Sequence, residues 1–405
     1  MSTVQQLWVG HSPLGGRTSL ELGGPGSKVL LLGSRANDIA ALAAVSAKEA
    51  GASPIVLDLG GTLAQSLSGH FTTYDYRSLL YDAFRLEAPE AWHAELVAAA
   101  YTATLDLTSE EEAIMISALQ GVSKEGGVAS PAAIYNVIGG VEGFRGFYVD
   151  KLKGHIGLLK LLEAVDDQTF GTLAHGNALV DFHGAPYPLA GELAVSLFLA
   201  KILALANATG TVESPIIITS SHRIFRRLPR VTHRSRLLVQ LLGWPSTLFL
   251  ATDQFQALDP LPGDLCPVRI YSSDAWHSSP GTVGRALPGT YVLDDGRSKR
   301  REFFVPRRIP ARVAEYVQAK SGKFSSPALT LAVLELVERF PLSTQESVVQ
   351  YLQPDFLPAD VNAELTNLQK RECVLLEPKD PGSGPKVFAF TLAENGRKLL
   401  EELRK

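Results

Sequence analysis

The sequence predicts an α/β protein in which a mostly parallel sheet carries an α-helical insertion and is followed by a smaller domain. Short apolar runs of strand type alternate with helical segments around residues 28–74 and again around 178–272. This alternation is typical of a parallel sheet covered on both faces. Strand signals disappear from about 76 to 167, and the pattern changes again after 325. We therefore expect a lead-in segment at 1–26, an α/β domain at 27–312 with its insertion at about 77–167, a linker at 313–324 and a second domain at 325–405.

The first strand–helix unit begins with the apolar run KVLLL. Gly33-Ser34 then leads to a helix over about 38–51, in which Ala and Val recur at helical spacing. A second buried-type strand at 54–59 stops at Gly60-Gly61, and 70–74 suggests a short third strand. The Gly/Ser/Pro-rich lead-in contains one possible strand near 18–22.

The predicted insertion and the second half of the sheet follow. Four helices are expected in the insertion, at 88–104, 109–121, 131–141 and 150–165. Ser109 followed by three glutamates is a helix start signal, because the hydroxyl can cap and the carboxylates complement the helix dipole. The α/β pattern then resumes with a long apolar helix over 189–206 and strands at 178–182, 215–219, 248–252, 268–272 and 290–293.

The C-terminal segment has the order of a small helical domain with a hairpin. Helices are expected at 330–340, 343–352 and 358–370, strands at 374–377 and 387–392, and a final helix at 394–403. A Gly/Pro-rich stretch joins the two strands. This order resembles a winged helix-turn-helix.

Composition and charge limit the class of protein. The chain has 405 residues and a net charge of −4, but residues 222–312 hold 15 Lys/Arg against 7 Asp/Glu, whereas residues 1–221 hold 12 against 22. A basic block inside an acidic chain suggests an anionic partner. Two distant cysteines offer neither a disulfide framework nor a cysteine zinc site, which fits the cytoplasm. No apolar run of membrane-spanning length and no signal pattern are expected.

The turn after the first strand invites comparison with a phosphate-binding loop. A strand that delivers a small-residue loop to a helix N-terminus holds phosphate in P-loop proteins. That motif ends in Gly-Lys-Ser/Thr, with the lysine on the phosphates and the hydroxyl on Mg²⁺. Counted from Gly33, these positions are Asp38, Ile39 and Ala40. None of the three supplies that chemistry.

The order of elements resembles the HerA/FtsK-type motor ATPases and related conjugative coupling proteins over about residues 16–310. KVLLLGSRANDIAA occupies the place of the P-loop, and VLDLGG, with Asp58, matches the strand that ends in an acid and a Gly-containing turn. LVDFHG at 179–184 resembles a later strand of the family that leads a long helix. LPGTYVLDDGRSKRREFFVPRR at 287–308 resembles the way such domains close. The resemblance implies a RecA-like, P-loop NTPase-type sheet.

Two further family motifs are present in altered form. Where the family has an apolar strand ending in Asp-Glu, often followed by Ala-His-Arg, this chain has Thr219 and Ser220 before Ser221-His222-Arg223. A sensing strand that ends in Ala-Thr-Gln resembles Ala251-Thr252-Asp253-Gln254. Phosphoryl transfer depends on electrostatic stabilisation by Lys and Mg²⁺, so we expect no hydrolysis and no cofactor. The predicted vestigial nucleotide site comprises Gly33, Ser34, Arg35, Asn37, Asp38, Asp58, Thr219, Ser220 and Gln254.

Arginines concentrate in two clusters of the basic block. Six lie within residues 222–236, where they suit phosphate contacts, although docking on the acidic half of a neighbouring subunit would use the same charges. The second cluster surrounds Arg300. The predicted DNA-binding residues here are Arg223, Arg226, Arg227, Arg230, Arg234, Arg236, Arg300 and Arg301.

The winged-helix resemblance implies a recognition helix at 358–370 and a wing at the hairpin. Side chains of the recognition helix are of types that read base edges, but the segment is net acidic, and winged helices also contact proteins. The predicted DNA contacts are Asn362, Thr366, Asn367, Lys370, Arg371, and Lys379 and Lys386 in the wing.

Other chemistries find little support. His175 and His183 flank one strand without a third metal ligand by spacing, and no Gly-x-Ser-x-Gly elbow is present. The sequence thus favours an inactive HerA/FtsK-like homologue that acts in the cytoplasm as a DNA-binding accessory or architectural protein. It would assemble with itself, as a ring or smaller oligomer, or with an active motor, and would not bind a membrane. The alternatives are a translocase-type ATPase with a non-standard nucleotide site and a winged-helix transcription regulator.

Overall fold

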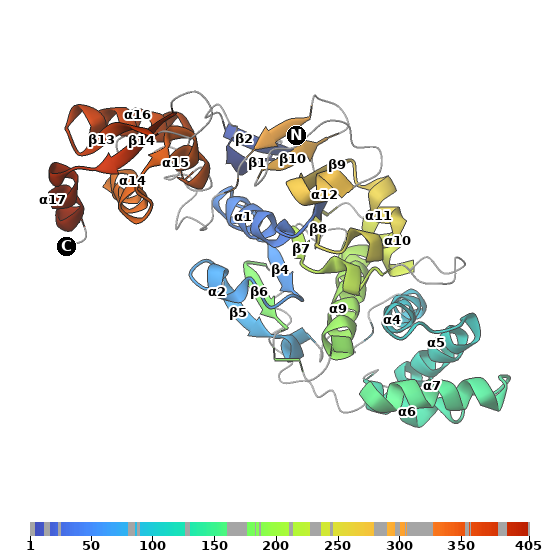
Figure 1. Cartoon of the computed structure of the whole chain (residues 1–405). Coiled ribbons are helices and arrows are strands. Elements are labelled where there is room, and N and C mark those ends of the chain that lie inside the picture. The colour runs from blue at the N-terminus through green and yellow to red at the C-terminus, as the bar shows by residue number, and fades with distance from the viewer. Residues whose placement is uncertain are drawn as a thin grey trace. The chain divides into compact units, whose positions relative to one another are not determined.

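The structure is a computed structural model of the whole chain (Figure 1). It describes residues 5–11, 17–22, 26–79, 86, 90–125, 130–159, 176–182, 184–185, 188–209, 214–226, 236–243, 246–278, 290–295, 300–303, 305, 327–352, 356, 358–379 and 387–403. The chain divides into two compact units. The first comprises Met1–Leu7, Glu21–Thr282 and Asp294–Lys299, and the second Trp8–Leu20, Val283–Leu293 and Arg300–Lys405.

A nine-stranded, mostly parallel sheet is the largest element of the fold. Its order is β11-β10-β9-β3-β8-β7-β4-β6-β5. The strands from β9 to β5 pair in parallel, whereas β10 and β11 pair antiparallel. The strands are β3 (Lys28–Leu32), β4 (Ile55–Asp58), β5 (Thr72–Asp75), β6 (Ala178–Asp181), β7 (Ile216–Ile218), β8 (Leu248–Thr252), β9 (Val268–Ser272), β10 (Tyr291–Asp294) and β11 (Arg301–Phe303).

The central strands consist mostly of apolar residues, and Lys28, Asp58 and Thr252 are the polar residues at their ends. β3, β4, β7 and β8 are buried throughout, as expected for parallel strands. Further helices and single turns connect the strands. These are α1 (Ala36–Glu49), α2 (Ala64–Leu67), η1 (Tyr76–Leu79), α9 (Pro188–Thr209), η2 (Ser221–Arg223), α10 (Arg236–Gly243), η3 (Phe255–Ala257), α11 (Pro260–Leu265) and α12 (Ser273–Ser278).

Four helices occupy the predicted insertion: α4 (Glu90–Leu105), α5 (Ser109–Lys124), α6 (Pro131–Ile138) and α7 (Gly146–Leu159). Figure 1 shows α5, α6 and α7 packed as one group. Thr108, rather than the expected Ser109, caps α5 in a capping box with Glu111. The Glu111 carboxylate also binds Lys151 of α7 at 2.9 Å, which ties the two helices together.

The long apolar helix corrects one sequence expectation. Residues 188–207 form a segment of 20 residues with a mean hydropathy of 1.9, so α9 has the length and composition of a membrane span. However, 89% of its most apolar window is buried, and α9 packs against α4 and α10. This burial is what the core helix of an α/β unit shows.

The N-terminal segment contains more strand than the sequence indicates. β1 (Gln5–His11) and β2 (Arg17–Leu22) form a separate two-stranded sheet. Leu7, Val9 and Leu20 are fully or nearly fully buried. The sequence predicts only the second of these strands, because Gly and Pro dominate the surrounding composition.

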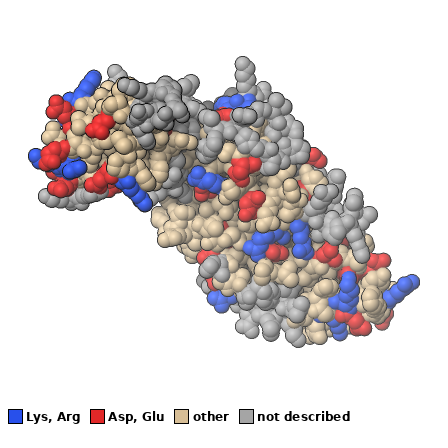
Figure 2. Space-filling model, in the orientation of Figure 1, with Lys and Arg blue, Asp and Glu red and all other residues tan. Residues whose placement is uncertain are grey.

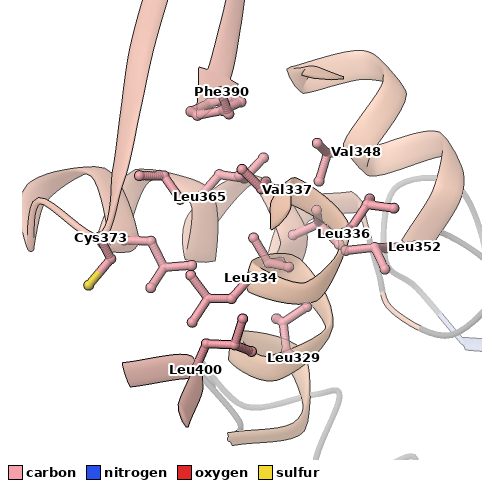
Figure 3. Packing of buried hydrophobic residues seen from close by; sticks show 14 residues of the cluster. Leu329, Leu334, Leu336, Val337, Val348, Leu352, Leu365, Cys373, Phe390 and Leu400 are labelled. Atoms are coloured by element: carbon pink, nitrogen blue, oxygen red, sulfur yellow. The ribbon is translucent and has the colours of Figure 1, made fainter. Parts of the chain in front are cut away.

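The C-terminal part of the second unit has its own hydrophobic core (Figure 3). Its strands form a three-stranded antiparallel sheet in the order β12-β14-β13. Leu334, Val337, Leu365 and Phe390 are buried together between helices and sheet. The elements are α14 (Pro327–Arg339), β12 (Ser343–Thr344), α15 (Gln345–Leu352), α16 (Pro358–Lys370), β13 (Val374–Lys379), β14 (Val387–Leu392) and α17 (Glu394–Leu403). Assignment of this segment to the winged-helix class remains a prediction.

A buried lysine at the start of β3 makes stability depend on pH. Lys28 is only 4% exposed, and its ammonium group donates to the carbonyl oxygens of Gly26 at 3.0 Å and Ser246 at 2.6 Å. Burial disfavours the charged form and lowers the pKa of Lys28 to about 8. Because the unfolded chain then holds this proton to higher pH, folding stability should rise from about pH 8 to about pH 10.5, by up to roughly 3 kcal/mol.

Urea denaturation of the wild type and of Lys28→Met between pH 7 and 10.5 measures this effect. The difference in unfolding free energy between the two proteins should change with pH in that window only. A constant difference would contradict a lowered pKa for Lys28.

Candidate functional site

The carboxyl ends of the central parallel strands meet at one edge of the sheet. Adjacency in the order β9-β3-β8-β7-β4-β6 brings together the residues at which these strands end. Ligands of open α/β sheets bind at this edge. The structure therefore places the predicted residues around Gly33, Asp58, Thr219 and Gln254 in one region of the first unit.

The loop after β3 makes a tight turn into α1. Gly33 has a φ of +114°, which lies in the region that favours glycine, and its N–H donates to the Thr252 carbonyl at 2.9 Å. The N–H of Ala36 then donates to the Gly33 carbonyl at 3.0 Å. The N-cap residue of α1, Arg35, makes no side-chain capping hydrogen bond. The loop consequently delivers the chain to a helix N-terminus, as the sequence predicts.

The charged side chains of the loop pair with each other. The guanidinium Nε of Arg35 lies 2.7 Å from the Asp38 carboxylate, and both side chains are more than one-third exposed. Asn37, which follows Arg35 closely, donates to the Thr62 hydroxyl at 3.0 Å. The arginine that could have replaced the P-loop lysine thus has a carboxylate as a partner.

A carboxylate from the neighbouring strand connection contacts this loop. The N–H of Ser34 donates to Asp274 Oδ2 at 3.2 Å, and the Ser272 hydroxyl donates to Asp274 Oδ1. Burial by itself raises the pKa of Asp274, but the hydrogen bonds from Ser272 and Ser34 outweigh it and lower that pKa. Sequence reasoning missed Asp274. The only signal was its position just after a strand that ends beside β3.

The end of β7 presents a hydroxyl where the related motif has a carboxylate. Thr219 is completely buried, and its hydroxyl donates to Asp58 Oδ1 at 2.9 Å and accepts from the Gly60 N–H at 3.2 Å. The Leu63 N–H donates to Asp58 Oδ2 at 2.7 Å. Burial raises the pKa of Asp58, although these hydrogen bonds partly oppose the shift. Ser220 follows in the left-handed region, with a φ of +48°.

The carboxylate of Asp181 lies near Asp58 because β4 and β6 pair with these residues in register. Repulsion from Asp181 contributes to the raised pKa of Asp58, after burial as the main cause. Two acids on adjacent strands do not by themselves form a metal site. Among the described residues, no group of three or more His, Cys, Asp or Glu is placed to hold a metal ion.

His222, in the turn η2 that follows β7, also lies at the carboxyl-end edge of the sheet. His222 Nδ1 lies 2.9 Å from the Thr252 hydroxyl and 3.7 Å from Asp253 Oδ1. Burial lowers the pKa of His222, although Asp253 opposes the shift. Gln254 contributes its N–H to the Thr252 hydroxyl at 3.0 Å. Thr252 therefore links the β7 and β8 connections, a role that the sequence does not reveal.

Three of the predicted DNA-binding arginines contact other parts of their own unit. Arg223 binds the Glu192 carboxylate at 3.2 Å and donates to the carbonyl oxygens of Leu59 at 2.6 Å and Pro188 at 3.3 Å. Arg226 donates to the Thr104 carbonyl at 3.0 Å. Arg236, which is largely exposed, lies 3.8 Å from the Glu95 carboxylate.

The other predicted arginines are distributed differently. Arg300 and Arg301 are exposed at β11. Arg227, Arg230 and Arg234 lie outside the described residues. On the face shown in Figure 2, basic and acidic side chains are interspersed among the described residues.

The predicted recognition helix, α16, exposes a polar surface. Thr366, Gln369, Lys370 and Arg371 are exposed. Asn362 is half-buried and accepts from the Gln345 amide at 2.8 Å, and Asn367 donates to Glu364 at 3.4 Å. Lys379 ends β13, and Lys386 lies outside the described residues. The described residues of this set thus lie on one helix and its hairpin.

Known proteins share this fold at low sequence identity. No protein-family model matches the sequence, and no curated protein matches it. The structure of VirB4 of Thermoanaerobacter pseudethanolicus is similar with a TM-score of 0.51 and 12% identity, covering 78% of this chain and 100% of that chain.

Two further structures are more distant. The bacterial conjugative coupling protein TrwBΔN70 has a TM-score of 0.49 and 8% identity over 77% of this chain and 92% of its own. The genome packaging NTPase B204 of Sulfolobus turreted icosahedral virus 2 has a TM-score of 0.35 and 9% identity, over 71% and 100%. The likeness to VirB4 is one of fold, and it confirms the predicted α/β class with a large, mostly parallel sheet.

Proposed function

We propose that this chain is a catalytically inactive homologue of the HerA/FtsK-type ATPases that acts as a DNA-binding accessory or architectural protein in the cytoplasm. The observation that carries the proposal is the chemistry at the ends of β3 and β7. Neither end offers the lysine, the metal-binding hydroxyl after it or the acid pair that phosphoryl transfer requires. Thr219 instead donates to the buried Asp58. In this proposal the strands and turns of a nucleotide site are retained, but its lysine and its acid pair are absent.

DNA binding is proposed mainly for the C-terminal segment. A helix, a short strand, two helices, a hairpin and a closing helix follow one another in the order of a winged helix. In that class the second helix of the pair enters the major groove, and here that helix is α16 with exposed Thr366 and Lys370. Arg223 and Arg226 are less suited to DNA, because both bind groups of their own unit.

Self-association, or association with an active motor subunit, belongs to the same proposal. The fold likeness to VirB4 supports a shared sheet, and a retained sheet would preserve the surfaces through which such subunits assemble. Mass photometry of the full chain, with and without a 40-base-pair duplex, tests this directly. A monomer under both conditions would contradict assembly with itself.

Two assays on the purified chain test the core of the proposal. Phosphate release with ATP and Mg²⁺ should not exceed the protein-free blank. Fluorescence anisotropy with duplex DNA should show binding that weakens at least roughly tenfold between 50 and 200 mM salt, because phosphate contacts release counterions. Hydrolysis would favour the translocase alternative, and absence of binding at low salt would overturn the DNA role.

Matched variants locate the DNA contact. The double variant Lys370→Ala/Arg371→Ala removes two exposed cations at the end of α16, and it should weaken binding by about tenfold. The double variant Arg397→Ala/Lys398→Ala removes two exposed cations from α17, and it should change affinity little. Equal effects of the two variants would argue against α16 as the contact.

A further inference from the structure

The loop after β3 is contacted by an anionic group of the chain itself. Its Ser34 N–H donates to Asp274 Oδ2 at 3.2 Å. In phosphate-binding loops, backbone N–H groups of this kind, beside a helix N-terminus, donate to phosphate oxygens. Here the acceptor is a carboxylate supplied by α12, the helix after the neighbouring strand β9.

We propose that Asp274 is a built-in anion that closes the loop 33–35 to phosphate ligands. This inference rests on the proposed function. It explains how a loop that no longer serves a nucleotide would stay without a phosphate ligand. Asp274 acts as a positioning and blocking residue, and no chemical step is assigned to it.

Hydrogen bonds from Ser272 and Ser34 help to hold the Asp274 carboxylate in this orientation. Oδ1 accepts from the Ser272 hydroxyl, and Oδ2 accepts from the Ser34 N–H. The hydrogen bonds also lower the pKa of Asp274, so the group is charged near neutral pH. A negative charge is favoured at the N-terminal end of α1, a helix of 14 residues whose N-cap residue, Arg35, makes no side-chain capping hydrogen bond.

Side-chain atoms of Ser272 and Ala275 leave little space between the loop and the β9–α12 connection. A Cβ atom placed on Gly33 would lie 1.6 Å from the Ser272 hydroxyl oxygen and 3.0 Å from the Ala275 Cβ. An incoming phosphate would therefore meet both a like charge and closely packed atoms. The nearby Arg35 offers little compensation, because Asp38 pairs with it at 2.7 Å.

Removal of the carboxylate should reopen the loop to anions. The probe is inorganic pyrophosphate without divalent ions, titrated calorimetrically into the full chain at low salt. Asp274→Ala should bind pyrophosphate at least roughly tenfold more tightly than the wild type, because a like charge is removed at close range and the Ser34 N–H is released. Asp274→Asn keeps a neutral acceptor, so its gain should be smaller.

The control is Asp150→Ala, which removes an exposed carboxylate from α7 and changes the net charge equally. Its affinity for pyrophosphate should match that of the wild type. A second readout is the Ser34 amide resonance in ¹⁵N-serine-labelled protein, assigned with Ser34→Ala. Pyrophosphate should shift this resonance in Asp274→Ala and leave it in place in the wild type.

Equal affinity of Asp274→Ala and the wild type, an equal gain in Asp150→Ala, or a shifted Ser34 resonance in the wild type would each overturn the inference. If Asp274→Ala unfolds, the comparison of Asp274→Asn with the wild type decides by the same criteria. These results are separate from the proposed function, which fails if the wild-type protein hydrolyses ATP or does not bind DNA.

Discussion

Arg223→Ala is expected to lower the unfolding free energy of the first unit by about 2–4 kcal/mol. The substitution leaves the buried Glu192 carboxylate without its guanidinium partner. It also leaves the carbonyl oxygens of Leu59 and Pro188 without this donor. These contacts join the turn after β4, the start of α9 and η2. Their loss should therefore also disturb the structure of the candidate site. Urea denaturation followed by circular dichroism measures the change.

Arg236→Ala provides the matched control for Arg223. Arg236 belongs to the same basic block, but its side chain is 59% exposed and its Glu95 partner lies 3.8 Å away. Its loss should change stability by less than about 0.5 kcal/mol. If instead Arg223→Ala retains wild-type stability and reduces DNA affinity, Arg223 is a DNA contact, and its intramolecular partners do not determine its role.

Gly33→Ala is expected to destabilise the first unit by about 3–5 kcal/mol, since backbone strain and overpacking act together. The φ of +114° is costly for alanine, and the new methyl group would overlap the Ser272 hydroxyl. Relief requires displacement of the β9–α12 connection, which would also break the contact of Ser34 with Asp274. Thermal unfolding measures the loss of stability.

Gly51→Ala separates the two causes. Gly51 has a φ of +85° and no atom within 4 Å of an added Cβ, so only the backbone cost applies, at about 1 kcal/mol. A loss for Gly33→Ala no larger than that for Gly51→Ala would show that Ser272 can move away. The close packing argued for the loop would then be wrong.

Much of the α/β architecture was predictable from local pattern. The apolar runs at β3, β4, β6, β7, β8 and β9 lie within a residue or two of their predicted positions, because a strand buried on both faces must be apolar at successive positions. The four insertion helices also form, although α7 starts at Gly146 rather than at 150. Short strands were less visible: β1, β11 and β12 were missed, since two to seven residues in a Gly-, Pro- or charge-rich context carry little periodic signal.

Residue identity alone shows that Gly-Lys-Ser/Thr after the first strand and Asp-Glu at the end of the strand before Ser221 are absent, because a motif of known spacing is read without coordinates. The contacts that the residues at these positions make come from the tertiary structure. Asp274 reaches Ser34 across 240 positions of sequence, and Thr219 reaches Asp58 across 161. The tertiary structure also shows that Arg223 and Arg226 bind groups of their own unit, whereas composition suggested a basic surface for an anionic partner. Parallel strand order creates these encounters, and contacts between residues so distant in sequence leave no local pattern from which they could be predicted.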